Sequence, residues 1–139
     1  MDFMRLARLE SDFWELRSGE DAHAKSPDRF WIPPLEKRRS LTRGQAAKLI
    51  FEIEGYDENG TVSTQGERMW VIIAERIGDL YIGILDNQPA SLEPNADVYL
   101  TIGAEIPFGP EHVINIGDPP ADYVAGQLGQ PPARRWPRE

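Results

Sequence analysis

The stretch Arg68–Pro89, RMWVIIAERIGDLYIGILDNQP, is the densest apolar part of the chain and the one best punctuated by turn signals. Two runs of β-branched and aromatic residues flank Gly78-Asp79, a dipeptide that favours a tight turn. A second turn signal, Asp86-Asn87-Gln88-Pro89, follows the second run. We therefore predict a β-hairpin with strands at 69–75 and 80–85, and we place it at the centre of the fold.

Alternation along the two strands predicts which of their side chains enter the core, because successive side chains point to opposite faces of a sheet. The expected core positions are Val71, Ile73, Ile82 and Ile84. Trp70 and Tyr81 then fall on the outer side, where they are either covered by another segment or exposed as a binding platform. Gly83, between Tyr81 and Leu85, indicates a bend or a close backbone approach.

The spacing of apolar residues predicts a helix at the N-terminus. Leu6, Leu9, Phe13 and Leu16 form one stripe at helical spacing. This N-terminal helix is expected to end by residue 19 and to pack on its own domain, with docking onto another chain as the alternative.

Composition divides the rest of the chain into three parts. They are a polar linker at 20–29, a β-rich domain at 30–116 and a Pro-rich C-terminal tail at 117–139. Further strands are expected at 48–54, 97–102 and 112–116. With the N-terminal helix, these elements predict an α+β fold, built on a strongly bent antiparallel sheet or a partly open small β-barrel of five to six strands.

The C-terminal tail contains five Pro and three Gly in its 23 residues. Tyr123, Val124 and Leu128 indicate a short helical turn within it. The segment 130–137 is expected either to fold back over the sheet or to act as an extended binding peptide around Trp136.

Charge is distributed unevenly along the 139 residues, whose net charge is −8. Residues 49–116 hold twelve Asp and Glu against Arg68 and Arg76, whereas the segments before and after have small or zero balances. An acidic surface repels phosphate backbones, so no nucleic acid is expected as a partner, and a basic protein is the compatible one. The alternative is that these charges only keep the surface solvated.

Composition also excludes several classes of protein. The chain has no Cys, which excludes disulfides, thiolate metal sites and Cys nucleophiles. No apolar run approaches the roughly 20 residues of a membrane span, and the N-terminus lacks the apolar core of a signal peptide. We therefore expect a cytoplasmic protein without membrane association.

No pattern of catalytic or metal-binding residues rises above background. The two histidines, His23 and His112, lack the spacing of metal ligands, and neither a nucleophile elbow nor a phosphate loop is present. No catalytic residue, metal or cofactor is predicted. If a small-ligand site exists, the residues a core does not need are the candidates for it: Trp70, Tyr81, Asp86, Asn87 and His112.

Several motifs together resemble a known group of proteins. They are Phe30-x-Ile32-Pro33-Pro34, Arg39-x-Leu41-x-x-Gly44, Lys48-Leu49-Ile50-Phe51, Glu67-Arg68-Met69-Trp70-Val71, Tyr81-Ile82-Gly83-Ile84-Leu85-Asp86-Asn87-x-Pro89 and Phe108-x-Pro110-Glu111-His112-Val113-Ile114. Over residues 28–116 the chain resembles small uncharacterised bacterial proteins of the domain-of-unknown-function family 2314 type. It departs from their pattern at Gln45 and Asn95, where an acid and a Gly are expected; both residues suit the same turns.

The resemblance implies no catalytic residues, because such families have no established activity. Some of their relatives look like immunity proteins from toxin gene clusters, which implies an inhibitor-type binding protein. The sequence thus leads to a first hypothesis, a non-enzymatic module that binds a basic partner protein through an acidic surface. The alternatives are a small-ligand-binding protein or enzyme with a site near Trp70, Asp86, Asn87 and His112, and a housekeeping protein with no separable site.

Overall fold

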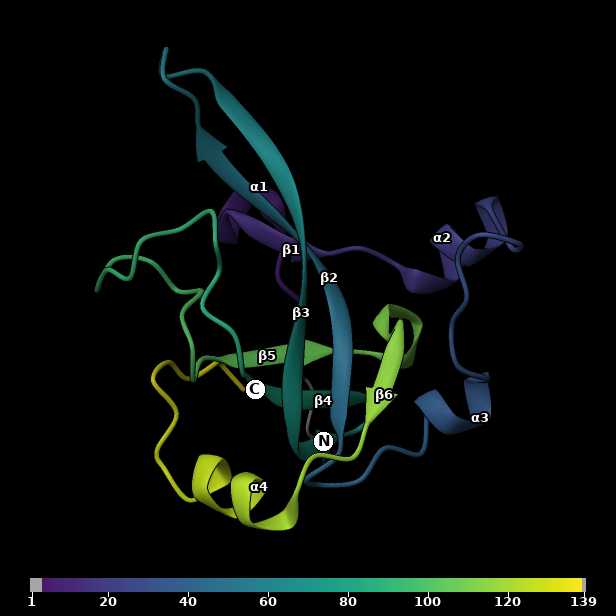
Figure 1. Cartoon of the computed structure of the whole chain (residues 1–139). Helices are drawn as coiled ribbons and strands as arrows, with labels where there is room; N and C mark the ends of the chain where they lie inside the picture. The colour runs from purple at the N-terminus through teal and green to yellow at the C-terminus, as the bar shows by residue number, and fades with distance from the viewer. Residues whose placement is uncertain (1–3, 139) are drawn as a thin grey trace.

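A curled antiparallel sheet organises the chain in the computed structural model, which describes residues 4–138 (Figure 1). The strands are β1 (Trp14–Leu16), β2 (Ala46–Tyr56), β3 (Val62–Ile77), β4 (Leu80–Leu85), β5 (Glu105–Phe108) and β6 (Asn115–Gly117). They run in the order β1-β2-β3-β4-β5, and β6 pairs with β2 beside β1. In Figure 1, β4 and β5 cross the lower half of the long β2–β3 ribbon at a steep angle, which confirms the predicted strongly bent sheet of an α+β fold.

Short helices lie at the edges of this sheet. They are α1 (Leu9–Asp12), α2 (Gly19–Lys25), α3 (Leu35–Arg38), the 3-10 turn η1 (Pro110–His112) and α4 (Ala121–Leu128). Within residues 4–138 no helix has the length and apolar character needed to cross a membrane.

The predicted central hairpin is confirmed as β3 and β4. Gly78 occupies the turn with a φ of 60°, a left-handed conformation that Gly adopts without steric cost. Gly83 also fulfils the expected close approach, because a Cβ there would lie 2.5 Å from Val71 Cγ2. No side chain fits at position 83 unless the packed strands move apart.

The predicted faces of the hairpin are partly wrong, because of a β-bulge at Ala74. The pairing runs Ile77↔Leu80 next to the turn, but beyond Ala74 it shifts by one residue, so Ile73 pairs with Gly83. Directly opposed residues share a face, and the extra residue therefore turns the odd-numbered side of β4 toward the core. Tyr81 is fully buried rather than outside, and Ile84 is only half-buried.

The core fills the concave side of the curled sheet. Its largest fully enclosed side chains are Trp14, Tyr81, Phe51, Phe108, Leu49, Ile72, Ile73, Ile82, Leu85, Leu100, Ile106 and Val71. Aromatic rings close one side of it: Trp14 stacks on Tyr99 with 6.1 Å between centroids, and Trp136 meets both rings edge-on. The core thus depends on residues from both ends of the chain.

The N-terminal helix is present but much shorter than predicted. It forms a single turn, α1, and stops at Phe13, which takes a left-handed φ of 67°. The next residues form β1, which pairs with β2 and buries Trp14. A strand of three residues is too short to reveal its period, so the stripe ending at Leu16 was compatible with both structures.

Three further predictions about local structure need correction. The polar segment 20–29 is not a plain linker, because α2 occupies its first half after an N-cap at Ser18. The segment 97–102 is not a strand, and the sheet continues instead with β5. The last strand, expected at 112–116, begins later, as β6, after η1.

The C-terminal tail folds back over the sheet, which was one of the two structures predicted for it. It begins with α4, which contains the expected helical turn, and then passes beside the strands through a bridge between Ala104 and Arg134. Trp136 is only 3% exposed, and its Nε1 donates a hydrogen bond of 2.9 Å to the Arg5 carbonyl. Residues from the two ends of the chain are therefore in direct contact.

Candidate functional site

Three of the residues predicted for a ligand site do lie together. The Trp70 N–H donates to Asn87 Oδ1 at 2.8 Å, and the Asp86 N–H donates to the Trp70 carbonyl at 2.9 Å. The three side chains line a cavity of about 330 Å³ at the end of β6. Asp86 also accepts a hydrogen bond of 2.7 Å from the Tyr123 hydroxyl of α4. The polar groups of this cavity thus already have partners that fix the loop after β4.

The other two predicted residues lie elsewhere. The Tyr81 hydroxyl is buried, where it donates to the Arg38 carbonyl and accepts from the Leu41 N–H. His112 belongs to a different and larger cavity, separate from that of Trp70. Trp70, Asp86, Asn87 and His112, which were predicted to lie near one another in a ligand site, therefore do not line one cavity.

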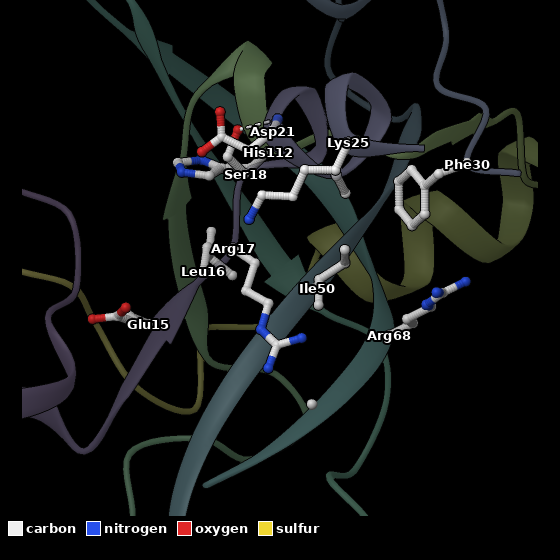
Figure 2. A pocket seen from close by; sticks show the side chains of 12 residues that line it. Glu15, Leu16, Arg17, Ser18, Asp21, Lys25, Phe30, Ile50, Arg68 and His112 are labelled. Atoms are coloured by element: carbon white, nitrogen blue, oxygen red, sulfur yellow. Dashed lines mark hydrogen bonds between the residues drawn. The ribbon is translucent and has the colours of Figure 1, made fainter. Parts of the chain in front are cut away.

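This larger cavity, of about 880 Å³, lies between α2 and the outer face of β2 and β3 (Figure 2). We name it the basic cavity. It is lined by Glu15, Leu16, Arg17, Ser18, Asp21, Ala22, Lys25, Phe30, Ile50, Gly66, Arg68 and His112. Four separate segments of the chain contribute to it, and three of its side chains are cationic.

The wall formed by α2 is fixed by close packing and by one buried cation. A Cβ on Gly19 would lie 2.8 Å from Ile114 Cγ2, so only Gly allows α2 to approach the chain after η1 this closely. Arg38, 5% exposed, donates to Glu20 of α2 at 2.7 Å and to the carbonyls of Pro33 and Pro110 at 2.7 and 2.8 Å. Arg38 is thus a structural residue that joins α2, α3 and η1.

The cationic side chains of the basic cavity differ in their partners. Arg17 forms an ion pair with Glu52 of β2. Arg68 lies over the ring of Phe30, with 5.3 Å between its Cζ and the ring centroid. Neither Lys25 nor Arg68 forms an ion pair with any residue in the range 4–138. In Figure 2 the amino group of Lys25 extends into the cavity toward Arg17.

His112 contributes a neutral ring to the cavity. It is 7% exposed, and burial lowers its pKa below the ordinary 6.5 despite the opposing charges of Glu111 and Glu20. Nδ1 accepts a hydrogen bond of 2.9 Å from the Gly109 N–H, which leaves the proton of the neutral ring on Nε2. Within residues 4–138 nothing accepts a hydrogen bond from that Nε2–H.

A second feature, next to the basic cavity, has the opposite charge. The end of the β2–β3 hairpin projects beyond the rest of the molecule (Figure 1). We name residues 52–67 the acidic arm. It contains five carboxylates and no cation: Glu52, Glu54, Asp57, Glu58 and Glu67. Tyr56 and Val62, which pair across its end, are 74% and 52% exposed.

The carboxylates of the acidic arm are not all free. Glu52 pairs with Arg17, and Glu67 accepts hydrogen bonds from Ala90 and Ser91, which tie the loop after β4 to β3. Asp57 accepts from backbone N–H groups inside its own turn. Glu54 and Glu58 form no hydrogen bond or ion pair through their side chains with residues 4–138, so the arm presents unpaired negative charge at these two positions.

Comparisons with protein-family models, with curated proteins and with solved structures gave no match. The resemblance to family 2314 proteins therefore rests on the sequence motifs alone. Sequence reasoning missed Arg17, Lys25 and Arg68 as neighbours, because Arg17 and Lys25 flank the start and end of α2 whereas Arg68 lies in β3. The only available signal was the position of Arg68, one of two cations in an otherwise acidic stretch.

Proposed function

We propose that the protein is a non-enzymatic protein-binding module that holds a basic partner with the acidic arm. The observation that carries the proposal is the arm itself, a projecting hairpin with five carboxylates and no cation between residues 52 and 67. Charges that only keep the surface solvated would not need to be placed on a projecting hairpin. Concentrated charge of one sign attracts a partner of the opposite sign over long range and accelerates the encounter.

The arm also offers contacts that act at short range. Tyr56 and Val62 form an exposed apolar pair among the carboxylates, and aromatic residues in such positions often contribute much of the binding energy of an interface. β3 has no strand partner on its outer edge before Val71 among the described residues. An extended segment of a basic partner can add to this edge as a further strand.

The resemblance to family 2314 proteins supports the same class of function. Immunity-type relatives imply an inhibitor that covers a toxin, and catalytic domains that act on nucleic acids carry the basic surfaces that an acidic inhibitor fits. Under this proposal the partner is a basic protein, and the protein itself performs no reaction.

The proposal can be tested by affinity capture from the source cells with matched variants. The tagged wild-type protein is compared with the double variant Glu54→Gln/Glu58→Gln, which removes two unpaired charges from the arm. We expect the wild type to retain a basic protein at low salt, and to lose it as salt is raised to about 0.5 M, where screening is strong. The arm variant should retain much less of it.

The control is the double variant Glu93→Gln/Asp97→Asn, which removes the same number of exposed charges from the loop after β4. It should capture the partner as the wild type does. Equal losses in both variants would mean that only net charge matters. A partner that stays bound in the arm variant and at high salt would show that the acidic arm is not the binding surface.

A further inference from the structure

The basic cavity brings Arg17, Lys25 and Arg68 together on a chain with 23 Asp and Glu against 15 Lys and Arg. Lys25 and Arg68 have no ionic partner among residues 4–138, and Arg17 pairs with Glu52. Cations that share a cavity repel one another, and an anion between them relieves that repulsion. The cavity is therefore a candidate site for an anion.

The carboxylates of the lining do not fill this role. Glu15 accepts a hydrogen bond of 2.9 Å from the Leu9 N–H, and in Figure 2 its side chain is directed away from Lys25. Asp21 also lines the cavity, but it forms no ion pair with Lys25 or Arg17. The space between α2 and the sheet thus holds positive groups that the described chain does not neutralise.

His112 provides a second observation that points to a ligand. The ring is more than nine-tenths buried and lines the cavity, and its Nε2–H lacks an acceptor among residues 4–138. The Nε2 atom itself is accessible to solvent, so an oxygen of a ligand in the cavity can accept a hydrogen bond from it. Because this donor is uncharged, it can bind an anion without attracting carboxylates of the protein, as a cation would.

Apolar groups complete the lining and indicate the rest of the ligand. Leu16, Ile50 and Phe30 contribute hydrophobic surface, and Gly66 leaves the floor open because it has no side chain. The nearest atoms to a Cβ at position 66 would be those of the Arg17 guanidinium, at 3.6 Å. The volume of about 880 Å³ falls within the range of cavities that bind small organic molecules.

We propose that the basic cavity binds a small organic anion, a phosphate or carboxylate attached to an apolar body. Lys25 and Arg17 hold the anionic group, His112 Nε2–H donates a hydrogen bond to it, and the apolar body lies against Ile50 and Phe30. The site adjoins the base of the acidic arm, with which it shares Gly66, but its ligand is a small molecule rather than a protein.

The test uses the full chain and three probes of one shape: phenyl phosphate, benzoate and phenol. Binding is followed by NMR, through the methyl groups of Leu16 and Ile50. At least one of the two anions should bind saturably and about tenfold or more tightly than phenol, since a charge-assisted hydrogen bond is worth that much. The tighter anion identifies the head group. Equal binding of all three probes would overturn the proposal.

Matched variants locate the site. Lys25→Gln should weaken the anion about tenfold, whereas Lys37→Gln, an exposed cation on α3, should leave it unchanged. Gly66→Leu fills the floor and should abolish binding while the protein stays folded, as its NMR spectrum will show. Undiminished binding in Lys25→Gln and Gly66→Leu, or shifts confined to residues outside the cavity, would refute the assignment. The arm variant Glu54→Gln/Glu58→Gln should bind the anion as the wild type does.

Discussion

Two charged regions of this molecule differ in whether their charges find partners within the chain. One region is the C-terminal clasp, formed by Glu105, Arg138 and the backbone of Trp136. The other is the basic cavity beside α2. In the clasp each charge is satisfied within the chain, whereas in the cavity Lys25 and Arg68 are not. The comparison separates charges that hold the fold together from charges that are available to a ligand.

The clasp shows how a buried charge is made tolerable. Glu105 is only 4% exposed, yet it accepts from both Arg138 guanidinium nitrogens at 2.8 Å and from the Trp136 N–H at 2.8 Å. Burial alone would raise the pKa of Glu105, but these hydrogen bonds outweigh it and hold the pKa below the ordinary 4.5. Arg138 also reaches Glu75 at 2.6 Å, so the end of the tail is attached to both β5 and β3.

Breaking the clasp should give the largest effect. Arg138→Ala leaves the Glu105 carboxylate buried without its cation, and we expect a loss of about 3 kcal/mol in the free energy of unfolding. Urea denaturation followed by tryptophan fluorescence measures it. Arg135→Ala, which removes an exposed cation from the same tail, should cost less than about 0.5 kcal/mol. A similar loss of unfolding free energy in both variants would show that the clasp does not stabilise the fold.

The pH dependence of stability should distinguish the buried histidine from the exposed charges. Because burial lowers the folded-state pKa of His112, the unfolded chain binds a proton at a higher pH than the folded chain does. Stability contributed by the neutral ring is therefore complete above pH 6.5 and is lost as the pH falls below it.

Urea midpoints measured between pH 7.5 and 5.5 test this, since the carboxylates titrate mainly at lower pH. The decline should be smaller in His112→Gln than in the wild type. An unchanged decline in His112→Gln would assign the effect to other groups.

Removing a charge from the basic cavity should give the smallest effect on stability. Lys25→Gln deletes an exposed cation without an ionic partner, so the free energy of unfolding should change by less than about 0.5 kcal/mol. The same variant should lose anion affinity, as described above. A large destabilisation would mean that Lys25 belongs to the structural charges, as Arg138 does, and the contrast between the two regions would fail.

Much of the fold could be predicted from the sequence where local signals agree. The turn at Gly78, the alternation in β2 and the lack of space at Gly83 each follow from short-range steric rules. The bulge at Ala74 could not be predicted, because an inserted residue leaves no compositional mark in an apolar run. That single residue accounts for the wrong placement of Tyr81.

The candidate sites were less accessible to prediction than the fold. The composition showed that the middle of the chain is acidic, and the acidic arm contains part of these carboxylates. The basic cavity is assembled from β1, α2, β2, β3 and η1, and Arg68 is far along the sequence from Arg17 and Lys25. Arg17, Lys25 and Arg68 line one cavity only in the folded structure, and no local sequence pattern predicts this arrangement.

The projection of the acidic arm has a consequence for its motion. β1 supports β2 only as far as Ile53, and β4 supports β3 only from Val71. The outer residues, 55–63, are therefore held by a two-stranded ribbon alone, and such a ribbon is marginally stable in water. This end of the hairpin should open locally and exchange its amide hydrogens long before the sheet unfolds. A partner would then have to order the arm as it binds, and part of its binding free energy would be spent on restraining that motion.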